Sequence, residues 1–315
     1  MFRLENFMGK RILTSSFLDG EAVHAFFTTR DLPLKSGERD DLIQEVENNK
    51  KLLCEGLNIP LENLIIPIQT HSDNVGVVKR EKEKGKSKQE LQNCSPVHLI
   101  TPHPQPLSRK GRGEQLDNLS SFASHLSPLE NTDALVTNEK NLALALNFAD
   151  CVPIIFFDPV KKVAAIAHAG WRGTVAKIAP KTVEKMVKNF SSKPKDIIAL
   201  IGPAIGGCCF EVGDDVSKKL LDSLPLTPTL SRKGRGGLTF TSPLSEKSQT
   251  SNPPILQSSK IDLKLINKLQ LLASGLKKID LCEYCTFCQS ELFFSYRREN
   301  GKTARHSAVV TISKR

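Results

Sequence analysis

NLALALNFADCVPIIFFDPVKKVAAIAHAGWRG, residues 141–173, is the stretch that decides the fold. It contains three apolar runs, Leu142–Phe148, Val152–Phe157 and Val163–Ala167, and each ends at polar or turn-forming residues. Continuous apolar runs of this length, bounded by turn signals, predict strands that are buried on both faces. The stretch therefore predicts the centre of a layered fold, with helices or a second sheet covering each side of these strands.

Three side chains that can bind a soft or borderline metal ion follow predicted strands. Cys151 and His168 follow the first and third of these runs, and His71 follows another apolar run, Asn63–Gln69. A thiolate and two imidazoles suit Zn²⁺, and three protein ligands leave one coordination position open, as in catalytic zinc sites. The residues alone leave a plainer interpretation open, in which Cys151 is a small buried hydrophobe and each His only forms hydrogen bonds.

Length and composition favour a folded chain without a membrane segment. The 315 residues are 39% hydrophobic, which is enough for a core of ordinary size. No apolar run approaches the length of a membrane span, and residues 1–10 lack the apolar region of a signal peptide. Eight Cys without a signal sequence favour free thiols over a disulfide framework. We therefore expect a cytoplasmic protein with no membrane partner.

Two basic segments hold almost all of the net charge of +10. Residues 79–113 carry nine Lys or Arg and three Glu, and residues 225–258 carry four Lys or Arg and one Glu. Both segments are poor in apolar residues, and each contains the word LSRKGRG, at 107–113 and at 230–236. A repeat without a fixed period or a hydrophobic face does not build a fold.

We interpret the two segments as insertions in exposed loops, where extra length costs little closure entropy. The expected organisation is one catalytic domain over residues 1–315, with low-complexity basic insertions at about 79–130 and 225–258. The alternative is a pair of basic arms that bind nucleic acid. Because the rest of the chain is close to neutral, we expect no nucleic-acid partner.

Outside these segments, strands and helices interleave, and several strands are joined by tight turns. This pattern predicts an α/β protein with mixed sheets. Helices are predicted at 40–56, 174–190, 214–224 and 262–275, and further strands at 23–29, 63–69, 76–79, 132–136, 197–201, 291–297 and 307–312. In the second helix, Thr174 is the predicted N-cap, and Pro180 is expected to bend or split the helix.

The other notable cysteines form two groups, Cys208–Cys209 and CEYCTFC at 282–288. The second group has CxxC spacing twice, which by itself suggests a metal knuckle. No second CxxC or His pair lies nearby in the sequence to complete four ligands. We therefore predict that Cys282, Cys285 and Cys288 are mostly structural thiols.

Six motifs, in this order, resemble the YfiH-type, laccase-domain family, whose members are described as polyphenol oxidases, copper-binding proteins or purine nucleoside phosphorylases. They are QTHSDNV (69–75), TDALVTN (132–138), NFADCVPIIFFD (147–158), HAGWRGT (168–174), IGPAIGGCCFEVGDDV (201–216) and FFSYRR (293–298). The resemblance implies mixed β-sheets in a sandwich flanked by helices, similar to the catalytic domain of the cytotoxic necrotizing factor toxins. It also implies a Zn²⁺ site made by His71, Cys151 and His168. Where the family often has Gly-Arg-Gln, this chain has Ala304-Arg305-His306, which we expect to add a surface His.

The activity that the resemblance implies is phosphorolysis of purine nucleosides (adenosine, inosine, guanosine, methylthioadenosine), with adenosine deamination beside it. The partners would be a purine nucleoside and phosphate. Arg172, just past the predicted metal loop, is expected to hold phosphate, with Arg297 and Arg30 as further candidates. Asp150 is expected to act as an acid or base, or to orient a ligand histidine. Trp171 either stacks on a purine or packs in the core.

Two alternatives stay open. A laccase needs on the order of ten His, largely in HxH and HCH clusters, whereas this chain has seven His and no HxH, so it cannot be a multicopper laccase by itself. Copper in the Cys/His₂ site, and with it a copper-dependent polyphenol oxidase, remains possible because Cu²⁺ outcompetes Zn²⁺ in raw affinity. The other alternative is a cysteine hydrolase or deamidase in which Cys151 is the nucleophile and His168 its base.

Overall fold

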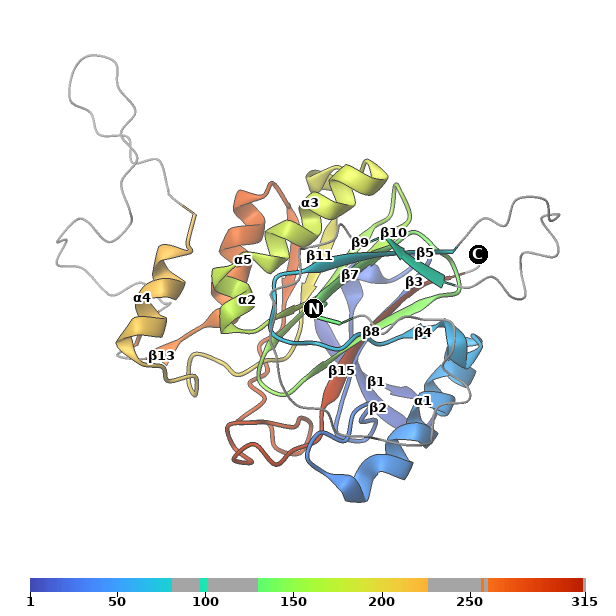
Figure 1. Ribbon diagram of the computed structural model, residues 1–315, viewed down its shortest axis with the longest axis horizontal. Coiled ribbons are helices and arrows are strands. Elements are labelled where there is room, and N and C mark those ends of the chain that lie inside the picture. Colours follow the sequence, from blue (N-terminus) through green and yellow to red (C-terminus); the bar gives the residue numbers. More distant parts are fainter. Residues whose placement is uncertain (81–96, 101–129, 226–255, 258–259, 314–315) are drawn as a thin grey trace, which may run out of the picture.

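Two β-sheets face each other between two groups of helices in the computed structural model, which describes residues 1–80, 97–100, 130–225, 256–257 and 260–313 (Figure 1). The six-stranded sheet has the order β1-β2-β3-β15-β8-β4. Its strands are Phe2–Phe7 (β1), Lys10–Ser15 (β2), Val23–Thr28 (β3), His306–Ile312 (β15), Ala143–Phe148 (β8) and Leu64–Ile65 (β4).

The seven-stranded sheet has the order β14-β11-β9-β10-β7-β5-β6. Its strands are Lys278–Leu281 (β14), Ile198–Ile201 (β11), Val152–Asp158 (β9), Val163–Ala169 (β10), Ala134–Thr137 (β7), Val75–Arg80 (β5) and Val97–Ile100 (β6). A short antiparallel pair joins β12 (Leu256–Gln257) to β13 (Lys260–Ile261). The helices are α1 (Ile43–Leu57), α2 (Trp171–Val175), α3 (Ile178–Phe190), α4 (Asp214–Asp222) and α5 (Leu263–Ala273).

Both large sheets are mixed, as the sequence predicts. Strand β4 runs parallel to β8, β14 runs parallel to β11, and β5 runs parallel to β7. Antiparallel pairs make up the rest, including β9 with β10 and β15 with both β3 and β8. The predicted fold class, an α/β protein with mixed sheets in a sandwich flanked by helices, is confirmed.

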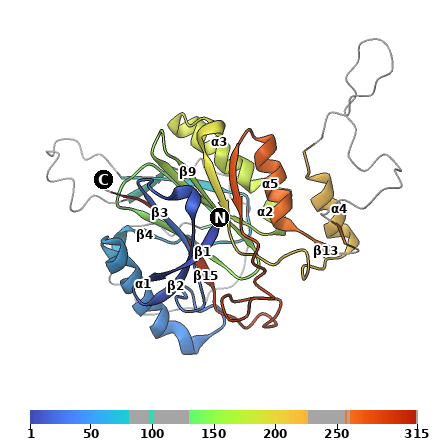
Figure 2. The ribbon, with the colours of Figure 1, turned by 180° about the vertical axis from the view of Figure 1, so that it is seen from behind.

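The central strands are largely apolar because they are covered on both faces. In β9, Ile155 and Phe157 pack in the core between the two sheets, whereas Ile154 and Phe156 pack in the core beneath helices α3, α4 and α5. Strand β8 divides its side chains in the same way between the intersheet core and a third core beside α1. Figure 1 shows α3 and α5 on one side of the sandwich and α1 on the other, and Figure 2 shows the same layers from behind.

The predicted helix over residues 174–190 is two helices, and the break does not lie at the proline. Lys177 has a left-handed backbone, with φ of 61°, and separates α2 from α3. Pro180 is the third residue of α3, where a missing backbone N–H costs nothing because the first turn has no acceptor for it. Thr174 lies inside α2 and is therefore not an N-cap.

The predicted strand over residues 291–297 is wrong. This segment forms successive turns, and the Arg298 guanidinium holds them by donating hydrogen bonds to the carbonyls of Thr286, Phe287 and Phe293. Strand β15 already has β3 and β8 on its two edges, so it has no free edge for a hairpin partner.

The structure differs from the sequence prediction at three further places. His306 is fully buried in β15 beside Phe293, at 5.3 Å between ring centroids, and is not a surface residue. Of the strand predicted over 63–69, only β4 forms. The hairpin of β1 and β2 was not predicted, because its sequence is largely polar.

The two LSRKGRG repeats, at 107–113 and 230–236, lie outside the described residues. Within the described chain, no helix is both long and apolar enough to cross a membrane.

Candidate metal centre

Strand pairing brings the three predicted ligands together at one edge of the seven-stranded sheet. Strands β9 and β10 pair antiparallel with His168 opposite Pro153, so His168 lies beside the start of β9, which Cys151 immediately precedes. Strands β7 and β5 begin at the same edge, and the loop that leads into β5 carries His71. Residues from three separate parts of the chain therefore meet where buried strands end.

The ligand atoms of His71, Cys151 and His168 all lie within 4.8 Å of one another. The two imidazole rings are 4.9 Å apart between centroids and are inclined by 69°. His168 is buried and Cys151 is half-buried, whereas His71 is exposed. The cluster is thus closed on its inner side and reachable from outside, as a site with an open coordination position requires.

The carboxylate of Asp133 organises both histidines. Oδ1 lies 2.8 Å from Nδ1 of His168 and accepts the backbone N–H of His71 at 3.1 Å. Oδ2 accepts the backbone N–H groups of Thr70 at 3.1 Å and Ser72 at 2.7 Å, and the Ser72 hydroxyl at 2.7 Å. Asp133 is fully buried, so these donors replace the water that an ionised carboxylate needs.

The contact with Asp133 also sets the tautomer of His168. An ionised carboxylate oxygen can only accept, so Nδ1 carries a proton, and in the neutral ring that binds a metal Nε2 keeps its lone pair. This carboxylate–histidine arrangement is the usual support of a zinc-binding imidazole. The donor set of one thiol and two imidazoles, with one imidazole oriented in this way, fits Zn²⁺.

Backbone conformation around the cluster is unusual at two points. His71 and Asp150 both have positive φ, 61° and 87°, in the left-handed region that L-residues adopt at a cost of about 1–3 kcal/mol. Gly170 approaches the cluster so closely that a Cβ there would lie 2.9 Å from Cys151 Sγ and 3.3 Å from His71 Cδ2. Only glycine fits at that position without moving the ligands.

Without a metal, the pKa values of Cys151 and His168 favour an ion pair between a thiolate and an imidazolium. Burial raises the pKa of the Cys151 thiol, but the neighbouring His168 and His71 lower it to about 6. Burial lowers the pKa of His168, but the Cys151 thiolate and Asp133 raise it to about 9. Burial likewise raises the pKa of Asp133, and its hydrogen bonds with His168 and Ser72 lower it to about 2.

Among the described residues, Thr286 and Arg297, and not a histidine, hold the carboxylate of Asp150, which is next to Cys151. Its Oδ1 accepts the Thr286 hydroxyl and its Oδ2 accepts the Arg297 backbone N–H, both at 2.7 Å. The task of orienting a ligand histidine therefore belongs to Asp133. Asp150 instead joins the cluster to the segments around residues 286 and 297.

The predicted phosphate-binding arginines lie in different surroundings. Arg172 is exposed in α2, with its guanidinium carbon 4.4 Å from the centre of the Trp171 ring. Arg297 is also exposed, and its guanidinium donates to the Glu211 carbonyl at 3.1 Å. The guanidinium of Arg30 forms an ion pair with Glu299 at 2.9 Å, which fastens the turns at 290–299 to the end of β3. Trp171 is partly buried and packs against the core beneath the helices.

Sequence reasoning did not single out two residues that the structure places at the cluster. Asp133 stands directly before a buried strand, and that position is the signal that could have identified it. Arg305 is half-buried; burial lowers the pKa of its guanidinium, and the nearby Cys151 and Asp150 act against that shift. No local pattern marks Arg305, because it depends on β15 lying next to β8.

Comparisons with known proteins agree with the fold and the cluster. The family model described as multi-copper polyphenol oxidoreductase laccase matches residues 24–313. A Bacillus subtilis relative, purine nucleoside phosphorylase YlmD, is 34% identical over 280 residues, which cover 86% of this chain and 92% of the relative. Adenosine deaminase RL5, from an unknown prokaryotic organism, is 28% identical over 298 residues, covering 90% and 92%. The crystal structure of the Bacillus licheniformis hypothetical protein YfiH matches with a TM-score of 0.67 and 29% identity, over 99% of each chain.

We expect the Cys151 thiol of metal-stripped protein to react with iodoacetamide with a half-maximal rate near pH 6, because the two imidazoles stabilise the thiolate. Peptide mapping by mass spectrometry follows the site across a pH series. Cys54 serves as the control, since burial raises the pKa of its thiol to about 11. A midpoint for Cys151 near the ordinary thiol pKa of 9.0 contradicts the geometry described here.

Asp133→Asn is expected to weaken zinc binding about 10–100-fold, as loss of a partner that orients a ligand histidine usually does. Asp158→Asn is the matched control, because Asp158 is also a buried carboxylate that accepts backbone N–H groups, at the other end of β9. Competition with a chromophoric chelator measures both affinities, and equal affinities of the two variants would refute the role of Asp133.

Asp133→Asn should also change how the free energy of unfolding depends on pH in acid. The folded-state pKa of Asp133 lies below its unfolded value, so its carboxylate contributes stability above pH 3.8 that is lost as the pH falls toward 2. The free energy of unfolding of the wild type should therefore fall more steeply over this window than that of Asp133→Asn. Urea titrations at several pH values measure the two slopes.

Proposed function

This chain belongs to the multi-copper polyphenol oxidoreductase laccase family, and within that family we propose that it is a zinc-dependent purine nucleoside phosphorylase with adenosine deaminase side activity. The observation that carries the proposal is the cluster of His71, Cys151 and His168, with His168 oriented by Asp133 and the exposed His71 on the open side. The names of the YlmD and RL5 relatives supply the reaction class.

The chain's own residues would divide the work of binding and positioning. His71, Cys151 and His168 would hold the Zn²⁺, with the Cys151 sulfur as thiolate and Nε2 as the ligand atom of His168. When bound, the ion supplies a Lewis acid that stabilises developing negative charge or activates water. Asp133 holds the His168 imidazole and the backbone of His71 in place, so much of the ligand geometry would exist before substrate arrives.

Phosphorolysis requires an anion beside C1′ of the ribose, because a phosphate oxygen forms the new bond as the bond from C1′ to the purine nitrogen breaks. Arg172 is the first candidate to hold this phosphate, since its exposed guanidinium lies just beyond Gly170 and, among the described residues, stacks on the Trp171 ring rather than pairing with a carboxylate. Arg297 and Arg30 are weaker candidates, because Glu211 and Glu299 already engage them. Arg305, whose positive charge interacts with Cys151, is a further candidate.

Asp150 is proposed to act near the substrate as an acid or base, or as a hydrogen-bonding group for the ribose. Its carboxylate is held by Thr286 and by the backbone of Arg297, which fixes its position beside Cys151. The catalytic domain is proposed to extend over residues 1–315, with the segments at about 79–130 and 225–258 as insertions outside the chemistry.

A copper-dependent polyphenol oxidase is the family's other description, and copper remains able to occupy the same Cys/His₂ cluster. Among the described residues, the groups of three or more side chains that could hold a metal are this cluster and a group of four cysteines. Neither resembles a trinuclear copper centre built from histidines.

One observation favours a second candidate function. In the metal-free cluster, Cys151, His168 and Asp133 have the order and the protonation of a nucleophile, a base and an orienting carboxylate. A cysteine hydrolase or deamidase would use this arrangement without any metal.

Assays of inosine and adenosine, with and without phosphate, test the proposal. We expect hypoxanthine and ribose 1-phosphate from inosine only when phosphate is present, and slower conversion of adenosine to inosine. Cys151→Ala should abolish both activities because it removes a zinc ligand, whereas Cys54→Ala, in the core beside α1, should retain them. Turnover by metal-free protein that thiol alkylation blocks would instead support the cysteine hydrolase.

A further inference from the structure

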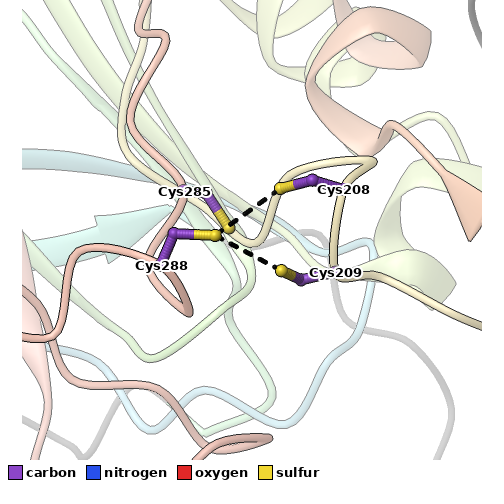
Figure 3. A group of neighbouring side chains, drawn as sticks. All are labelled: Cys208, Cys209, Cys285 and Cys288. Carbon is purple, nitrogen blue, oxygen red and sulfur yellow. Dashed lines mark hydrogen bonds between the residues drawn. The ribbon is translucent and has the colours of Figure 1, made fainter.

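A second cluster of possible metal ligands lies outside the site described above. Figure 3 shows the sulfur atoms of Cys208, Cys209, Cys285 and Cys288 pointing toward one another from two loops. All four lie within 4.8 Å of one another. Cys288 Sγ is 3.8 Å from Cys208 Sγ and 3.4 Å from Cys209 Sγ, although about 80 residues separate these cysteines in the sequence.

These spacings fit a tetrahedral metal site better than a disulfide. Four sulfurs placed about 2.3 Å from a central Zn²⁺ at the corners of a tetrahedron are about 3.8 Å apart. A disulfide would bring one pair to about 2.05 Å and leave the other two thiols without a partner. The observed separation of 3.8 Å matches the edge of a ZnS₄ tetrahedron, and that of 3.4 Å is closer to this edge than to the length of a disulfide bond.

Backbone groups of both loops form the contacts that hold the loops in this position. Ala204 forms a bridge with Cys285, and the Ala204 carbonyl accepts the backbone N–H of Thr286 at 3.1 Å. The backbone N–H of Gly206 donates to Cys285 Sγ at 3.2 Å, a contact that suits a thiolate acceptor. Arg298 fixes the carbonyls between Cys285 and Cys288, which sets the turn of that CxxC segment.

Gly206 is a point of close approach between the two loops. A Cβ there would lie 3.3 Å from Cys208 Sγ and 3.4 Å from Cys285 Cβ, so a side chain would crowd the thiols. The Gly206 carbonyl also accepts the backbone N–H groups of Cys209 and Phe210, both at 2.9 Å, which closes the turn that presents the adjacent pair Cys208–Cys209. This turn therefore directs the thiols of Cys208 and Cys209 toward the Cys285–Cys288 turn.

We propose that Cys208, Cys209, Cys285 and Cys288 bind a structural zinc ion. Four thiolates complete the coordination of Zn²⁺ and leave no position for substrate, which is the pattern of structural rather than catalytic sites. Soft thiolates in tetrahedral geometry also disfavour Mg²⁺ and Ca²⁺, which prefer oxygen ligands. This site is separate from the His71, Cys151 and His168 cluster, and the inference does not depend on the proposed enzymatic function.

A zinc ion bound by the four cysteines would also affect the cluster of His71, Cys151 and His168. Thr286, next to Cys285, donates its hydroxyl to Asp150, and Asp150 precedes Cys151. The Ile205 N–H, in the loop that carries Cys208, donates to the Asp150 carbonyl at 3.0 Å. An ion that joins the two loops would therefore fix two of the contacts that hold Asp150 in its left-handed conformation.

Metal analysis of the full chain, purified under reducing conditions, tests the proposal. We expect two zinc ions per chain in the wild type and one in Cys208→Ala/Cys288→Ala, whose two cysteines are exposed and can be replaced with little effect on the core. His71→Ala should also lose one ion, from the other cluster. Cys282→Ala is the matched control, because Cys282 belongs to the same CEYCTFC segment but packs in the intersheet core, and it should keep both ions.

Replacement of zinc by Co²⁺ gives a second, spectroscopic readout in the wild type and in the variants. A tetrathiolate site should add intense sulfur-to-cobalt absorption that remains in His71→Ala and disappears in Cys208→Ala/Cys288→Ala. One zinc per chain in the reduced wild type that persists in the double variant, iron in place of zinc, or a disulfide within the four cysteines of reduced protein would each overturn the proposal. Loss of nucleoside phosphorylase activity alone would bear only on the function proposed above.

Discussion

The buried carboxylate of Asp133 is the interaction on which the candidate metal centre depends. It accepts three consecutive backbone N–H groups, from Thr70 to Ser72, together with the Ser72 hydroxyl, and it orients the His168 ring. Hydrogen bonds to a charged group contribute about 1.5–3 kcal/mol each, so the set can offset both the burial of the charge and the left-handed backbone of His71. One side chain thereby places two of the three metal ligands before any ion binds.

The layered core explains why this arrangement can be rigid. Strands β9 and β10 are buried on both faces, between the second sheet and the helices, so their ends are fixed in register. Cys151 and His168 lie at those ends, so their positions are fixed as well. The exposed side of the cluster is formed by His71, in a loop, and the short helix α2 begins directly after Gly170, which lies against Cys151 and His71. A fixed inner side and an open outer side are what a catalytic metal requires of its protein.

Much of the fold and of the candidate metal centre could be predicted from the sequence, and the features that were not predicted have a common cause. The apolar runs identified the central strands, and the residues after them identified His71, Cys151 and His168, because both signals are local. Asp133 as the orienting residue, the turns in place of a strand at 291–297, and the meeting of Cys208–Cys209 with Cys285–Cys288 all depend on segments far apart in the chain. The sequence offers no nearby partner for CxxC at 285–288, whereas the fold supplies one through the Ala204 bridge.

The two cysteine-containing clusters differ in the way their proposed roles require. One has three mixed ligands and an exposed side, and the other has four thiols that would enclose an ion. Zinc X-ray absorption spectroscopy on the Cys208→Ala/Cys288→Ala variant tests the central claim most directly, since only the first cluster remains. The account predicts one sulfur at about 2.3 Å and two imidazole nitrogens at about 2.0–2.1 Å from the ion. A zinc environment without sulfur, or with a single imidazole, would contradict it.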